Sequence, residues 1–146
     1  MGLYFHYKEF INTYGTGAVA NFLWVLNPFT ENKYLHLLNK GKIMADAYIT
    51  SKQRFPEDFR HKVYPEPGGL LAWGATDNGD ELYWLAEGEP DGWPVIVYPP
   101  RASEYLEYAM PVTEFIYRIT SREMICEAFP DDFSGEKPEF ISAEAD

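Results

Sequence analysis

Residues Pro65 to Leu85 read PEPGGLLAWGATDNGDELYWL, and they carry the clearest structural signal in the chain. Two mostly apolar runs, Leu70 to Thr76 and Glu81 to Ala86, flank the tetrad Asp77-Asn78-Gly79-Asp80. An Asn-Gly pair favours the positive φ values that a tight hairpin turn needs, so the runs are predicted to be antiparallel strands joined by this turn.

The sheet is predicted to continue downstream of this hairpin. A third run, Trp93 to Tyr98, follows the turn-rich segment Glu87 to Gly92, and a further short strand is expected around Glu104 to Ala109. Consecutive hairpins of this kind give an antiparallel meander.

Helical periodicity flanks the meander on both sides. Tyr7, Phe10, Ile11 and Tyr14 lie at i, i+3, i+4 and i+7, and Gly15 follows where a left-handed residue would end a helix. The unbroken apolar segment from Val19 to Leu26 is predicted to be one buried strand.

A second helix is predicted from a cap at Thr30 to about Arg54, interrupted at Gly41. The residues expected to face inward are Leu35, Leu38, Ile43, Ala47 and Tyr48. A third helix begins with Pro111 at its first position, and its expected apolar face is Val112, Phe115, Ile116 and Ile119.

These elements predict an α+β fold, with a mostly antiparallel β-meander sheet packed against flanking helices. Residues 1–133 are expected to form a single domain, in which Glu123 to Phe129 return to the sheet. The acidic segment 134–146 is expected to be a mobile tail.

Charge and cysteine content restrict the classes of partner. With 12 basic and 23 acidic residues, the chain has a formal net charge of −11. Such a field repels phosphate backbones and anionic membranes, so we expect no direct binding to nucleic acid or membrane. A single cysteine, Cys126, excludes an intrachain disulfide, and no secretory leader pattern opens the sequence. We therefore expect a cytoplasmic protein.

No motif supports a catalytic, cofactor or metal site. Residues 15–20 match the dinucleotide-binding pattern G-x-G-x-x-A, but that chemistry needs a strand before the glycines and a helix after them, and here the order is reversed. A calcium loop starting at Asp77 fails because Leu82 stands where glycine is required. His6, His36 and His61 share no metal-ligand spacing, although their distance from Cys126 in sequence leaves a spatial Cys–His pair open.

The sequence resembles the SUKH superfamily, which includes yeast cell-wall-synthesis regulators and many bacterial immunity proteins. The resemblance rests on residues 7–17, 22–28, 55–57 and above all 65–85, and it extends to about residue 133. It implies an α+β fold without catalytic residues, used to bind and neutralise a cognate toxin. Relatives carry another helix before the segment that begins here at Tyr7, which predicts a short N-terminus for this chain.

The leading hypothesis is therefore a non-enzymatic immunity protein that binds a basic toxin domain, such as a nuclease. The alternatives are a regulatory scaffold for endogenous proteins and, less favoured, a small-ligand-binding domain or enzyme. The predicted interface is one face of the sheet with two acidic turns, and it comprises Asp77, Asn78, Asp80, Glu81, Tyr83, Trp84, Glu87, Glu89, Asp91 and Trp93. Tyr83 or Trp84 would be the apolar anchor and the carboxylates the rim.

Overall fold

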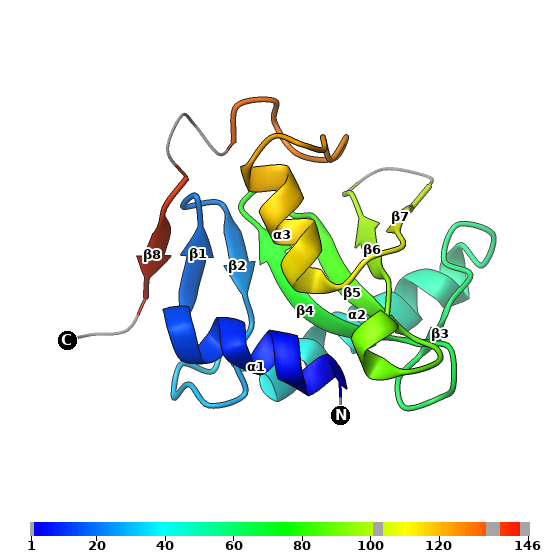
Figure 1. The fold of residues 1–146 in the computed structure, drawn as a ribbon. Coiled ribbons are helices and arrows are strands. Elements are labelled where there is room, and N and C mark those ends of the chain that lie inside the picture. Colours follow the sequence, from blue (N-terminus) through cyan, green and yellow to red (C-terminus); the bar gives the residue numbers. More distant parts are fainter. Residues whose placement is uncertain (1, 101–103, 134–137, 144–146) are drawn as a thin grey trace.

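The computed structural model describes residues 2–100, 104–133 and 138–143, with backbone alone at 2–6, 8 and 91. One eight-stranded sheet packs with three α-helices (Figure 1), which confirms the predicted α+β class. The helices are α1 (Gly2–Tyr14), α2 (Leu37–Arg54) and α3 (Val112–Thr120), and the strands are β1 (Gly17–Val19), β2 (Leu23–Val25), β3 (Lys62–Val63), β4 (Gly69–Thr76), β5 (Glu81–Ala86), β6 (Val95–Tyr98), β7 (Leu106–Tyr108) and β8 (Phe140–Ser142).

The predicted meander forms the centre of this sheet. Its strand order is β7-β6-β5-β4-β2-β1-β8, and every pair along this path is antiparallel. The exception is β3, which runs parallel to the first residues of β4. A short 3₁₀ turn, Pro90–Gly92, joins β5 to β6, so β6 begins at Val95 and not at Trp93 as predicted.

The turn between β4 and β5 differs from the predicted type. Gly79 has φ +90°, but Asn78 is not among the described residues with positive φ, so the turn is not a primed one. The Gly79 N–H donates to the Thr76 carbonyl, and the Thr76 N–H donates to the Asp80 carbonyl. A three-residue loop with glycine at its left-handed third position is the next commonest hairpin geometry.

The predicted single strand from Val19 to Leu26 is wrong, because the chain reverses inside it. Ala20 and Asn21 adopt φ values of 55° and 54°, and the Phe22 N–H donates to the Val19 carbonyl. The reversal places β1 and β2 side by side. Asn21 belongs to a residue type that tolerates positive φ, but alanine seldom adopts it, so the turn signal at this position was weak.

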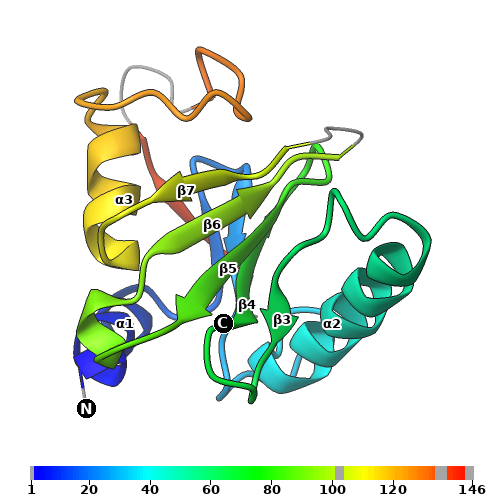
Figure 2. The ribbon, with the colours of Figure 1, turned by 90° about the vertical axis from the view of Figure 1, so that its right-hand side faces the viewer.

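The sheet separates two apolar layers, because side chains alternate between its faces along each strand. Figure 2 shows α1 and α3 on one side and α2 on the other. On β5, Leu82 and Trp84 pack with α1 and α3, whereas Tyr83 packs toward Met44 and Tyr48 of α2.

Helix α2 starts later than predicted, because the preceding loop satisfies its own backbone. Three successive turns use side-chain acceptors: Asn27 Oδ1 accepts from Phe29 N–H, Thr30 Oγ1 from Asn32 N–H, and Asn32 Oδ1 from Tyr34 N–H. Such local bonds compete with helix formation. His36 Nδ1 instead caps α2 by accepting from Leu38 and Asn39, and Gly41 does not interrupt the helix.

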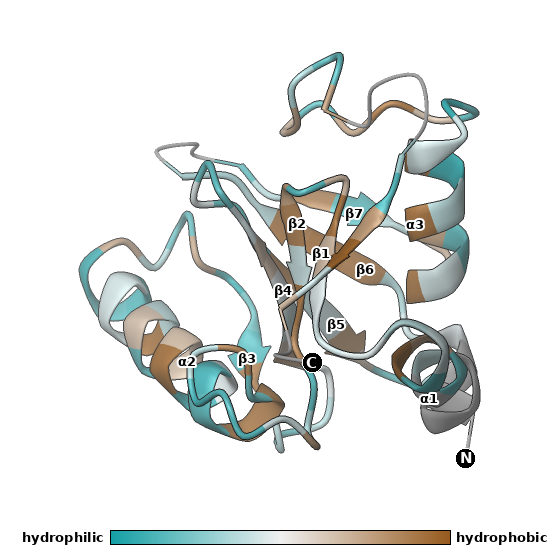
Figure 3. Ribbon diagram, turned by 90° about the vertical axis from the view of Figure 1, so that its left-hand side faces the viewer, coloured by the Kyte–Doolittle hydropathy of each residue, from teal (hydrophilic) through white to brown (hydrophobic). Residues whose placement is uncertain are grey.

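The inward face predicted for α2 is only partly correct. Tyr48 is buried, together with Met44, but Leu38 and Ile43 are 67% and 60% exposed. The helix therefore contacts the sheet along a narrow stripe, and Figure 3 shows it beside β3 and β4, away from β1 and β2.

The flanking helices α1 and α3 follow their sequence patterns. Gly15, at φ 74°, follows the last residue of α1 as predicted. The four residues predicted to face inward from α3 are all buried, with Pro111 as the cap and not the first helical residue.

The C-terminal part of the chain departs from two predictions. Glu123 to Phe129 form turns and not a strand, although Cys126 and Phe129 enter the core. Within the predicted mobile tail 134–146, residues Phe140–Ser142 form β8 and pair with β1, while 134–137 and 144–146 lie outside the described residues.

Candidate functional site

The acidic turns of the predicted interface lie at opposite ends of β5. Asp77 and Asn78 are exposed in the turn before the strand, and Glu87 and Glu89 are exposed after it. Asp91 belongs to the 3₁₀ turn, and its side chain lies outside the described residues. The structure therefore does not bring the predicted carboxylates together.

Three predicted interface residues are buried, which corrects their assignment to a surface. Tyr83 and Trp84, the proposed apolar anchors, are each 1% exposed and belong to the two core layers on opposite faces. Asp80 is also buried, and its carboxylate accepts a 2.6 Å hydrogen bond from Thr76 Oγ1. Burial raises the pKa of Asp80, an effect that this hydrogen bond partly offsets. Asp80 thus stabilises the turn.

The remaining two predicted residues are partly buried. Trp93 packs against the α1/α3 layer, and its indole N–H donates to the Gly88 carbonyl at 3.0 Å. Glu81 lies on the α2 side of the sheet, where burial raises its pKa and the nearby charge of Lys40 opposes that rise. Glu81 therefore connects the predicted interface to a surface that the sequence did not reveal.

That surface is centred on Trp24 in β2. Directly opposed residues share a sheet face, and the register places Ile141, Ala18, Trp24, Ala75, Glu81 and Tyr98 in one row across the α2 side. Tyr98 and Glu81 lie toward α2, whereas Figure 3 shows no helix over β2 on this side. The Trp24 indole N–H donates to Asp77 Oδ1 at 2.8 Å, which ties the acidic turn to this surface.

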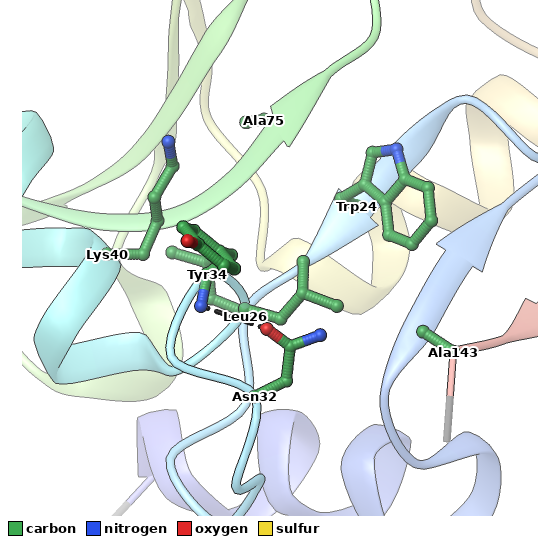
Figure 4. Close-up of a pocket in the computed structure, with 8 residues that line it drawn as sticks. Trp24, Leu26, Asn32, Tyr34, Lys40, Ala75 and Ala143 are labelled. Atoms are coloured by element: carbon green, nitrogen blue, oxygen red, sulfur yellow. Dashed lines mark hydrogen bonds between the residues drawn. The ribbon is translucent and has the colours of Figure 1, made fainter. Parts of the chain in front are cut away.

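A pocket of about 380 Å³, which we call the Trp24 pocket, opens on this surface. It is lined by Trp24, Leu26, Asn32, Tyr34, Leu35, Lys40, Ala75 and Ala143. Figure 4 shows Trp24 and Ala143 on one side and Tyr34 and Lys40 on the other. The Asn32 amide is engaged with the Tyr34 backbone, so the lining is mainly apolar with Lys40 as its one charged group.

Exposed apolar side chains occur in the segments that form the Trp24 pocket and its sheet face. Tyr34 is 69% exposed, and Phe29 in the same loop is 70% exposed. Ile141 of β8, in the same row as Trp24, is 42% exposed. Exposed aromatic side chains beside a concave apolar surface are typical of protein interaction sites.

A second pocket, of about 330 Å³, lies at the β7 edge of the sheet. Its charged lining consists of the carboxylates of Glu57, Asp58, Glu104 and Glu107 and the guanidinium of Arg60, and Tyr105 completes it. The excess of carboxylates places part of the chain's negative charge on this end of the molecule.

Behind Tyr105 lies a hydrogen-bonded cluster between α2 and β6. The hydroxyls of Tyr48 and Tyr98 are 2.9 Å apart, and Tyr98 Oη is 2.6 Å from His61 Nδ1. The His61 backbone N–H donates to Tyr48 Oη, and each of the two side-chain contacts joins groups that can both donate and accept. This network fastens the loop before β3 to the sheet.

Acidification is expected to destabilise the fold through His61. Burial, followed by the charge of Lys52, lowers the pKa of His61, while Tyr48, Tyr98 and Tyr105 face the ring without a compensating negative charge. His61 then binds a proton more readily in the unfolded chain than in the folded one. The free energy of unfolding is therefore highest above about pH 6.5, the ordinary pKa of histidine, and falls as the pH drops below that value. Urea unfolding at pH 7.5 and 5.5 measures this loss, and His61→Gln should show a smaller difference between the two pH values. An identical difference in both proteins would contradict the assignment to His61.

Neither His36 nor His61 makes a reactive centre with Cys126, and the His6 side chain lies outside the described residues. Cys126 is buried in the α1/α3 layer, and burial raises the pKa of its thiol. His61 lies on the other side of the sheet and His36 caps α2, so neither forms a pair with Cys126. Across residues 2–100, 104–133 and 138–143, no group of three or more His, Cys, Asp or Glu side chains is placed to hold a metal ion.

Comparison with protein-family models, curated proteins and solved structures finds no match to this chain. None of the helices in the described parts of the chain has the length and apolar character needed to cross a membrane.

Proposed function

We propose that this protein is a protein-binding module, most specifically an immunity protein that neutralises a basic toxin domain. The observation that carries the proposal is the Trp24 pocket, an apolar hollow flanked by exposed aromatic side chains on the uncovered part of the sheet. The binding role fits the α+β fold, and the immunity role rests on the resemblance of residues 65–85 to the SUKH superfamily.

The chemistry of the pocket favours an apolar side chain of the partner. Its only charged lining group, Lys40, lies near Glu81, whose carboxylate offsets that charge. An aromatic or long aliphatic anchor could then bury its surface against Trp24, Leu26 and Leu35 without leaving a charge unpaired.

Charge acts at longer range than the pocket. A chain with a net charge of −11 attracts a basic protein before contact, and this attraction mainly raises the association rate. Nucleases carry basic surfaces because they hold phosphates, so a nuclease toxin matches the sign of this field.

The test is co-purification of the protein with the polypeptide encoded by the neighbouring gene, followed by an assay of toxin neutralisation. We expect a stable complex whose association rate falls as salt rises from 0.05 to 0.5 M, while its dissociation rate changes less, because the field is screened within about 10 Å at 0.1 M salt. Stopped-flow mixing across ionic strengths measures both rates.

Binding without neutralisation, or capture only of endogenous proteins, would favour the regulatory scaffold. A salt-independent association rate would remove charge steering from the proposal.

A further inference from the structure

We propose that the edge of β1 that pairs with β8 is a strand-docking site, which accepts β8 of a second copy of this chain as well as its own. The inference is independent of the toxin-binding role. It rests on how β8 is held and on which atoms of β1 receive it.

The strand β8 lies at the end of the sheet. It is three residues long, and among the described strands it pairs with β1. Flanking backbone bonds run from Ala20 N–H to the Glu139 carbonyl at 2.6 Å and from Ala143 N–H to the Thr16 carbonyl at 2.8 Å. Ile141 and Ser142 are exposed, so among the strand residues Phe140 makes the main apolar contact.

Phe140 occupies a socket between the two helices on the α1/α3 side. Its ring lies 5.9 Å from that of Phe10 and 5.2 Å from that of Tyr14, measured between centroids. Val19 and Ile116 also line the adjoining cavity of about 150 Å³. The site therefore recognises an extended backbone that carries an aromatic side chain on its inner face.

Gly17 adapts the β1 edge to this strand. A Cβ added at Gly17 would lie 2.0 Å from the Ile141 carbonyl oxygen and 2.9 Å from the Phe140 ring, and all three of its nearest atoms belong to β8. The absent side chain thus allows the close approach of β8. A larger residue at position 17 would exclude β8 from this position.

The β8 strand of a second copy fits the β1 edge, because it is identical to the strand that pairs there. When β8 leaves, the β1 edge presents unpaired backbone groups and an empty aromatic socket, which favours pairing with another strand. The β8 of a second molecule carries the same Phe140 and backbone pattern, and exchange of identical elements between protomers is a low-cost route to a dimer. Ala143, which lines the Trp24 pocket, would then come from the other copy.

Two full-length variants separate the strand from its site. In the alternating pattern of β1–β8 hydrogen bonds, the Ile141 N–H faces the Ala18 carbonyl. Ile141→Pro removes this N–H, so the variant has a defective β8 but keeps an open docking site on β1. Gly17→Val blocks the site but leaves β8 intact. We expect each variant alone to be monomeric, and an equimolar mixture to form a species of twice the monomer mass in sedimentation velocity.

The control is the double variant Gly17→Val/Ile141→Pro, which should form no dimer with either single variant. A mixture of the two single variants that stays monomeric, while both retain their near-UV circular dichroism, would overturn the proposal.

If Gly17→Val does not fold, a fluorescein-labelled peptide of residues 138–143 replaces it as the donor of the strand. Saturable binding of that peptide to the Ile141→Pro protein would support the site. Binding to the wild type should be at least about tenfold weaker, because the protein's own β8 competes with the peptide at an effective concentration near millimolar. Equal or absent binding to both proteins would refute it.

Discussion

Phe115→Ala is expected to lower the free energy of unfolding by about 3–5 kcal/mol, the usual range for removing a buried phenylalanine side chain. The Phe115 ring is fully buried under the sheet. Its centroid lies 5.1 Å from that of Tyr108, 6.2 Å from that of Trp73 and 6.4 Å from that of Phe129. Truncation would leave a cavity among three aromatic rings, which rigid neighbours fill poorly. Urea denaturation monitored by tryptophan fluorescence measures the loss.

Tyr117→Ala is the matched control, because Tyr117 is on the same helix but is 61% exposed. It should change stability by less than about 0.5 kcal/mol. Similar losses for the two variants would show that the loss does not come from packing under the sheet, because alanine favours the helix equally at both positions.

Tyr34→Ser is expected to weaken binding of the basic partner roughly thirtyfold, which corresponds to about 2 kcal/mol, the threshold for an interface hot spot. Tyr34 lines the Trp24 pocket and is 69% exposed in the free protein, so its ring can be covered by a partner without rearrangement of the core. Isothermal titration calorimetry with the purified partner measures the change in affinity.

Tyr117→Ser controls for loss of an exposed tyrosine elsewhere, since α3 packs on the opposite side of the sheet (Figure 2). Both serine variants should unfold at nearly the wild-type urea concentration. Unchanged affinity in Tyr34→Ser, or an equal loss in Tyr117→Ser, would move the interface away from the Trp24 pocket. The acidic pocket around Glu104 and Glu107 would then be the next surface to test.

Local sequence signals were sufficient for the centre of the fold. The apolar runs on both sides of residues 77–80 predicted β4 and β5, and the i, i+3, i+4, i+7 pattern after Pro111 predicted α3 and its buried face. These signals succeed because backbone periodicity determines which side chains share a face, and a nearby turn determines which strands pair. The net charge likewise needs no structure.

The location of the candidate site needed the tertiary structure. Alternation along β5 correctly separates Tyr83 from Trp84, but only the packing of helices on both sides of the sheet buries both residues. Trp24 belongs to an equally apolar run, yet α2 stops short of it, and its side chain lines an open pocket. Periodicity assigns a residue to a face of a strand, and it carries no information on whether another element covers that face.

The α+β class, the antiparallel hairpin centre, two of the three helices and the acidic field therefore follow from the order of the amino acids. Three features needed the packed chain: β8 completes the edge beside Gly17, Asp80 is internal, and Trp24, Tyr34 and Ala143 line one pocket. Trp24 and Tyr34 are near each other in the chain, whereas Ala143 lies far from both. Its place beside Trp24 depends on the non-local pairing of β8 with β1, and no short turn between these strands sets their register.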